Sequence, residues 1–214
     1  MIKRTLLTSF AVIGTFGISG CLSTILPAPK AGGHVYRLSS DLLASETANL
    51  VTSTTAYTVR IDRPNAPKAL QGYDLVVSTD GNRLVTIADA EWADTLPTLI
   101  QRSFLSHLNA QPDLIGILPT SGARSTYRAH ITIRNFEARF DQGEEAAPLI
   151  LVDYLVTLSD AGSRNLIATQ SFHAERRANS IRVSDIVDSK SRANRDLLGE
   201  ISGWMVQKLA NTPS

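Results

Sequence analysis

The side chain best suited to chemistry in this chain is its single cysteine, Cys21, which stands in the stretch TFGISGCLST. A thiolate is a strong nucleophile near neutral pH, so this position is a candidate for modification. Before it come the basic pair Lys3–Arg4, an uncharged apolar run from Leu6 to Ile18 and two small residues. This order is typical of a secretory signal peptide, and the run is shorter than the ~20 residues that span a bilayer. We therefore expect residues 1–20 to be a signal peptide.

The four residues Ile18, Ser19, Gly20 and Cys21 resemble the lipobox of bacterial lipoproteins, in which an aliphatic residue and two small residues precede a modified cysteine. The resemblance implies a diacylglyceryl group on the thiol, cleavage before Cys21 and acylation of the new amino group, with palmitate as a typical acyl chain. The alternatives are a buried, unreactive cysteine and a redox thiol. We expect the covalent lipid on Cys21 and no other cofactor.

The expected lipid determines the location. Two or three acyl chains hold a protein firmly to a membrane, because each buried methylene contributes about 0.8 kcal/mol. Lipoproteins that stay in the inner membrane of enteric bacteria often carry aspartate at the second mature position, where this chain has Leu22. We therefore expect a lipid-anchored protein that faces the periplasm, at the outer membrane rather than the inner one.

Composition excludes one class of partner. Cleavage removes two basic residues and no acidic one, so 19 basic and 20 acidic side chains remain. Binding of nucleic acid needs an excess of clustered Lys and Arg, so we expect no nucleic-acid partner. A lone cysteine forms no internal disulfide, so a hydrophobic core must supply the stability. Residues 21–33, with their Pro, Gly and small residues, predict a lipidated, flexible tether, and residues 34–214 a periplasmic domain.

The first half of this domain shows a strand pattern followed by a helix pattern. Alternating apolar and polar residues predict strands at 34–38 and 56–62 and a hairpin at 73–88 with Asp80-Gly81 in its turn. Apolar residues at three- and four-residue spacing then predict an amphipathic helix that ends near residue 108. Proline costs about 3 kcal/mol in a helix interior, so the helix either begins near Thr95 or kinks at Pro97.

The second half predicts a short strand and then an antiparallel meander, at residues 113–119, 126–140, 149–160 and 166–178. A change of parity between Ile133 and Phe136 predicts a β-bulge in the first meander strand. Residues 185–211 predict a second amphipathic helix. The expected fold is α+β, a largely antiparallel sheet with two main amphipathic helices packed against it in a single domain.

Catalytic and metal-binding motifs are not found. The chain has no Gly-x-Ser-x-Gly elbow and no phosphate loop, and no histidine pair has the four-residue spacing of a helical zinc site. His130 and His173 could meet on neighbouring strands, although two ordinary strand histidines are the simpler interpretation. Arg176 and Arg177 could bind an anionic headgroup, or they mark an exposed strand end. We therefore expect no enzyme, no catalytic residue and no metal site.

The two tryptophans are the remaining candidates for a binding role. Trp92 lies beside Leu96 at the start of the first helix pattern, and Trp204 lies in the second. The simpler interpretation is that both indoles pack onto the sheet. The alternative is that Trp92, Leu96 and Trp204 contribute to an apolar groove for an acyl chain or a partner peptide.

A family resemblance extends along the mature chain. Its matching stretches are the lipobox, YRL at 36–38, VRIDRPNAPKALQGYDLVV at 59–77, GNRLVTIADAEWADTLPTLIQRSFL at 81–105, FEARF at 136–140 and the C-terminal helix with Trp204. These stretches resemble the auxiliary lipoproteins of bacterial lipid-type ABC transport systems, which partner a mammalian-cell-entry (MCE) domain protein. EWADTLPTLIQ is the most specific of them, and it favours a helix that starts just before Pro97.

The resemblance implies a non-enzymatic docking subunit of an MCE-type transport system that moves lipids or other hydrophobic molecules between the inner and outer membranes. Only Cys21 carries over as a functional residue. The alternatives are a stand-alone periplasmic lipoprotein that binds phospholipid itself and, less favoured, a periplasmic hydrolase. A homo-oligomer is also compatible with docking onto a ring.

Overall fold

The structure of the chain is a computed structural model that describes residues 33–39, 56–79 and 83–212. The predicted lipobox, most of the tether and the turn residues Asp80 and Gly81 lie outside these ranges. The elements, in chain order, are β1 (His34–Tyr36), β2 (Tyr57–Ile61), a 3-10 turn (Lys68–Leu70), β3 (Asp74–Thr79), β4 (Arg83–Trp92), α1 (Leu96–Asn109), β5 (Leu114–Ile117), a second 3-10 turn (Pro119–Ser121), β6 (Tyr127–Arg139), β7 (Leu149–Asp160), β8 (Leu166–Arg177) and α2 (Val183–Ala210).

The strands form one sheet in which β6 is the central strand. One edge of β6 pairs with β7, which pairs in turn with β8. The other edge pairs with β2 near its start and with β3 near its end, so β6 changes neighbours along its length. The expected α+β class is confirmed, but the sheet is mixed: β1–β4, β2–β5, β2–β6 and β3–β6 are parallel. Alternation in the sequence predicts which residues are buried and carries no information on strand direction.

The predicted meander and its irregularity are confirmed. Strands β6, β7 and β8 pair in antiparallel order. The register of β6 against β7 shifts between Ile133 and Asn135, where the parity of apolar residues changes in the sequence. After the shift Phe136 returns to the buried face, opposite Val152 of β7.

Helix α1 begins where the sequence predicts. Thr95 is its N-cap residue and Pro97 lies in the first turn, where the missing N–H costs no helical hydrogen bond. The Thr95 hydroxyl lies 2.8 Å from the Thr98 hydroxyl, and Asp94 accepts a 2.7 Å hydrogen bond from the Thr95 N–H. Pro97 therefore starts this helix and does not kink it.

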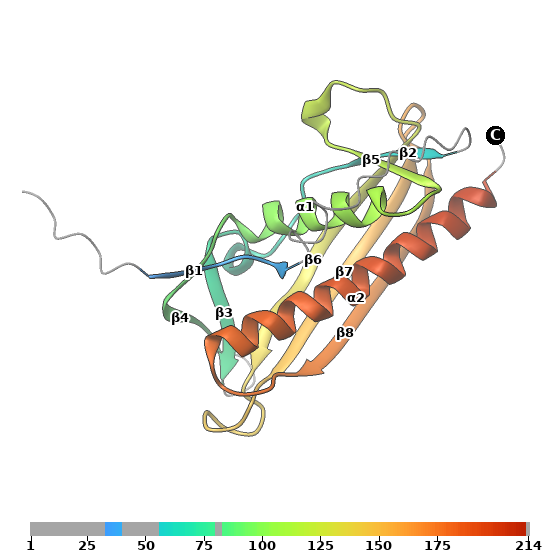
Figure 1. Ribbon diagram of the computed structural model, residues 1–214. Coiled ribbons are helices and arrows are strands. Elements are labelled where there is room, and N and C mark those ends of the chain that lie inside the picture. The colour runs from blue at the N-terminus through green and yellow to red at the C-terminus, as the bar shows by residue number, and fades with distance from the viewer. Residues whose placement is uncertain (1–32, 40–55, 80–82, 213–214) are drawn as a thin grey trace, which may run out of the picture. The chain divides into compact units, whose positions relative to one another are not determined.

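Both helices lie side by side on one face of the sheet, and α2 packs on β7 and β8 (Figure 1). The core between the helices and the sheet contains large, fully buried side chains, among them Phe104, Tyr154 and Leu197. The described residues belong to one unit, Gly33–Ser214. Among the described helices, none is both long and apolar enough to cross a membrane.

Two glycines differ in how much space surrounds them: Gly116 of β5 lies close against helix α1, and Gly199 of α2 lies in open space. A Cβ on Gly116 of β5 would lie 3.1 Å from Leu105 Cδ1 and 3.3 Å from Leu108 Cβ, whereas a Cβ on Gly199 of α2 meets nothing within 4 Å. We expect Gly116→Val to destabilise the domain by about 1–3 kcal/mol through overpacking against α1. Gly199→Ala should stabilise it by up to about 1 kcal/mol through helix propensity. Urea unfolding of both variants checks the opposite signs, and a neutral Gly116→Val would contradict the close α1–β5 packing.

Candidate functional site

A groove of about 740 Å³ runs between the edge strand β8 and helix α2. Its apolar part is formed by Phe172 and Trp204, whose rings pack edge to face with their centroids 5.5 Å apart. Trp204 is only 8 % exposed, and its indole N–H is buried without a hydrogen-bond partner. A buried donor without an acceptor costs about 1–3 kcal/mol, so this indole position lowers the stability of the fold.

The rest of the groove is polar. Its other side chains come from both elements and carry amide, hydroxyl, imidazole and charged groups: Gln170, Ser171, His173, Glu200, Gln207 and Lys208. Glu200 and Lys208 take part in no ion pair within the described ranges. Gly203 adds a wall without a side chain. A lining of this kind suits a protein surface better than an acyl chain, whose methylenes need apolar walls.

The other two residues of the predicted apolar groove lie elsewhere. Trp92 and Leu96 are 2 % and 1 % exposed and belong to the core at the junction of β4 and α1. Trp92 packs edge to face on Phe136, with ring centroids 6.1 Å apart. The structure therefore brings Trp204 alone of the three to the groove.

A buried lysine that the sequence analysis missed lies against the Trp92–Phe136 pair. Lys190 of α2 is fully buried, and its amine donates hydrogen bonds to the carbonyls of Val76 (2.8 Å) and Phe136 (3.2 Å). The nitrogen also lies 5.4 Å from the Phe136 ring centroid and 6.0 Å from that of Trp92, within the range of cation–π attraction.

The place of Lys190 explains why the fold accepts it. Strands β3 and β6 pair only at Val77 with Ala138 and at Ser78 with Arg139. Just before this pairing the two strands separate, and the Lys190 amine bridges a carbonyl of each. A buried carbonyl needs a donor, so the lysine satisfies two groups that the sheet leaves open.

Burial lowers the pKa of Lys190 to about 7, and the nearby Glu137 carboxylate opposes this shift. Glu137 is 7 % exposed and accepts a 2.9 Å hydrogen bond from Arg139. The sequence does place Lys190 on the buried face of the second helix, because it precedes the apolar residues Ala193 and Leu197 by three and seven residues. Lysine is almost never fully buried, so the helix pattern alone does not predict that Lys190 lies in the core.

A second buried polar contact joins α2 to the sheet. The Tyr154 hydroxyl of β7 donates a 2.7 Å hydrogen bond to the Asn194 side-chain oxygen, and burial raises the pKa of Tyr154 well above its usual value. On the same helix the Ser191 hydroxyl accepts a hydrogen bond from the Ser39 N–H. These polar contacts fix the rotation and register of α2, because a one-residue shift would leave buried groups unpaired.

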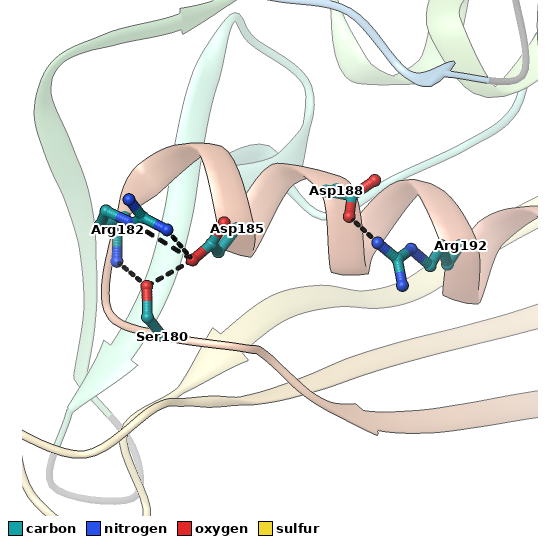
Figure 2. A network of polar contacts seen from close by, with 5 residues as sticks. All are labelled: Ser180, Arg182, Asp185, Asp188 and Arg192. Atoms are coloured by element: carbon teal, nitrogen blue, oxygen red, sulfur yellow. Dashed lines mark hydrogen bonds and ion pairs between the residues drawn. The ribbon is translucent and has the colours of Figure 1, made fainter.

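The start of α2 is held by a polar network (Figure 2). Asp185 accepts hydrogen bonds from the Ser180 hydroxyl (2.5 Å) and the Arg182 guanidinium (3.3 Å), and the bond from Ser180 is the main reason that its pKa is lowered. One turn further on, Asp188 pairs with Arg192. A carboxylate in the first turn also interacts favourably with the helix dipole.

The two arginines proposed as a headgroup site are paired. Arg176 contacts Asp196 of α2 at 2.7 Å, and Arg177 forms a two-point contact with Asp141. The hydrogen bond from Arg177 lowers the pKa of Asp141. Both arginines therefore have an intramolecular partner at this end of β8.

His130 and His173 do not come together. His130 lies opposite Thr157 of β7, whereas His173 lies opposite Asp153 of the same strand, four residues away. Within the described ranges no group of three or more His, Cys, Asp or Glu side chains is placed to hold a metal ion.

The buried amine gives a pH-dependent prediction. As the pH rises from 7 toward 10, native Lys190 loses its proton, while an unfolded lysine, with a pKa of about 10.4, largely keeps it. The unfolded state then binds more protons, so this group makes the protein more stable as the pH rises through this range. We expect the free energy of unfolding of the wild type, minus that of Lys190→Met, to increase from pH 7 to pH 10 in urea titrations.

The Lys68→Met variant is the matched control, because it removes the amine of an exposed lysine. At pH 9 Lys190→Met should itself be less stable than the wild type by about 1–3 kcal/mol, since two buried carbonyls lose their donor. A Lys190 effect independent of pH would show that the native amine keeps its proton.

Comparison with known proteins gives a family match and similar solved structures. Residues 36–202 match the family described as ABC-type transport auxiliary lipoprotein component. A DUF330-family protein from Xanthomonas campestris has a similar structure, with a TM-score of 0.67 and 16 % identity over 72 % of this chain and 86 % of that one. An uncharacterized protein is similar with a TM-score of 0.62 and 16 % identity, over 80 % and 97 % of the two chains. No curated protein gives a significant match. The two solved structures share the fold, and by the match over residues 36–202 the chain belongs to the ABC-type transport auxiliary lipoprotein family.

Proposed function

We propose that the protein is a lipid-anchored, non-enzymatic docking subunit of an MCE-type ABC transport system that moves lipids or other hydrophobic molecules between the inner and outer membranes. The observation that carries the proposal is the family match over residues 36–202, which covers nearly all of the folded unit. An MCE-domain protein is the proposed partner, and the lipid on Cys21 is the proposed covalent group.

Chain length sets how far the domain stands from its membrane. Twelve residues, 22–33, separate the proposed lipid on Cys21 from β1. Fully extended, they reach at most about 40 Å. A domain held this close to one membrane can keep a partner assembly near it and shorten the aqueous path of an apolar cargo.

The alternative is a stand-alone lipoprotein that binds phospholipid in the β8–α2 groove. Trp204 and Phe172 favour it, since they offer an apolar surface. Six of the groove's side chains are polar or charged, however, and this lining favours a protein partner. Docking is therefore our first proposal.

The lipid anchor and the partner are tested together by affinity purification. Full-length tagged protein is taken from crosslinked, gently solubilised envelopes, and co-purifying proteins are identified by mass spectrometry. We expect an MCE-domain protein with the wild type and at least a tenfold loss with Cys21→Ser, because an untethered domain is no longer concentrated at the membrane. Phospholipid without an MCE-domain protein would instead support the stand-alone alternative.

The residue after the cysteine tests the proposed membrane. Leu22→Asp keeps Cys21 and introduces the inner-membrane signal of enteric lipoproteins. In such a host we expect the wild type to fractionate with the outer membrane and Leu22→Asp with the inner one, as measured by immunoblotting of density-gradient fractions. Leu22→Asn is the matched control for size. Co-fractionation of the wild type with the inner membrane would contradict the proposed location.

A further inference from the structure

A second cavity lies beside the start of helix α1 and shares no residue with the β8–α2 groove. Its volume is about 400 Å³. The residues that line it are Arg63, Pro64, Asn65, Ala66, Gln71 and Pro97. All of them except Pro97 belong to the segment that joins β2 to β3, and Pro97 stands in the first turn of α1.

The backbone around this cavity is held in place without a ligand. The Asn65 N–H donates to the Ile131 carbonyl at 3.0 Å, and the Asn65 carbonyl accepts from the Ile133 N–H at 2.8 Å. Proline fixes its own φ angle, so Pro64 and Pro97 give the cavity two rigid walls. A preorganised cavity loses little conformational entropy when it binds, which favours affinity.

Three side chains of the cavity offer hydrogen-bond donors. The Arg63 Nη2 atom donates to the Thr95 hydroxyl at 3.0 Å, and the Gln71 amide donates to the Ala66 carbonyl at 2.8 Å. Each of these bonds orients its side chain and leaves further N–H groups of the same side chain for a ligand. Asn65 contributes a third polar group, its side-chain amide.

The end of helix α1 is not the source of these donors. The Leu96 N–H donates to the Gly72 carbonyl, the Thr98 N–H donates to the Thr95 carbonyl, and Pro97 has no N–H. The binding capacity of the cavity therefore comes from its side chains.

The charge of the cavity is complementary to an anion. The carboxylates next to it in the chain have partners of their own, since Asp62 pairs with Arg128 and Asp94 pairs with Arg102. Arg63 forms no ion pair within the part of the chain that the structure describes. A guanidinium flanked by amides and free of carboxylates suits a group with several charged oxygens, and a phosphate is such a group.

The cavity lies at the end of the domain to which the tether leads. The Ala93 N–H donates to the Tyr36 carbonyl of β1, and the Trp92 N–H donates to the Tyr73 carbonyl, both at 2.7 Å. Tyr73 stands two residues after Gln71 of the cavity. Strand β1 and the start of α1 thus lie on the same side of the domain (Figure 1). Residues 22–33 keep this side near the membrane that holds the proposed anchor.

We propose that this cavity binds the phosphate of a phospholipid headgroup from the membrane to which the protein is anchored. The inference rests on the proposed lipid on Cys21 and does not depend on an MCE-domain partner. Tyr73, which is 51 % exposed, suits the same boundary, because its ring is apolar and its hydroxyl is polar. A headgroup held beside α1 would orient a domain that a flexible tether alone leaves free to rotate.

Native mass spectrometry of the full-length lipoprotein, released from detergent micelles that contain phosphatidylglycerol, tests the site. We expect the wild type to retain one non-covalent phosphatidylglycerol and Arg63→Gln to retain about fivefold less, because a charged hydrogen bond is lost. Arg124→Gln is the matched control, since it removes the same charge from an exposed arginine outside the cavity. A wild type without bound lipid, or equal retention by wild type and Arg63→Gln, would overturn the proposal.

Asn65 provides a second test at nearly constant side-chain size. Asn65→Asp places a negative charge in the cavity and should lower retention about fivefold, whereas Asn65→Ala removes the amide alone and should lower it less. Equal retention by these two variants would contradict an anionic ligand.

Inorganic phosphate identifies the source of the anion. We expect an excess of it to leave phosphatidylglycerol bound, because the walls of the cavity also contact the rest of the headgroup. A protein that holds inorganic phosphate but no phosphatidylglycerol would overturn the assignment to a membrane lipid. The intact mass in the same spectra reports the covalent lipid on Cys21, so failure of the anchor is distinguished from failure of the cavity. Retained phosphatidylglycerol without an MCE partner would count against the proposed function alone.

Discussion

The amine of Lys190 donates hydrogen bonds to two strand carbonyls at a point where the pairing of β3 with β6 is interrupted. Strand β6 pairs with β3 near its end, and just before this pairing the two strands separate. Carbonyls of Val76 and Phe136 then face the interior without a strand partner, and the lysine of α2 donates to both. Burying an amine is costly, and it is tolerated here because the amine donates to two carbonyls and packs between two aromatic rings. The same contact ties the C-terminal helix to strands from both halves of the chain.

Fixing α2 in this way also fixes the surface at the edge of the sheet. The Tyr154–Asn194 hydrogen bond sets the rotation of the helix further along, and with it the side that faces β8. Trp204 is thereby held against Phe172, with Glu200 and Lys208 on either side of it. Buried polar contacts are a modest source of stability, but they select one register over its neighbours. In this protein they turn an amphipathic helix into a helix with one defined exposed edge.

Local sequence signals predicted much of this fold. Thr95 and Pro97 mark the start of α1, and the parity change near Phe136 marks the irregularity in β6, because each depends only on nearby residues. Parallel pairing of β6 with β2 and β3 was not predicted, since it depends on contacts between distant segments. Lys190 was missed for the same reason: its partners are 114 and 54 residues away. Of the predicted groove residues, Trp204 is at the groove and Trp92 in the core, a difference that the helix pattern alone does not contain.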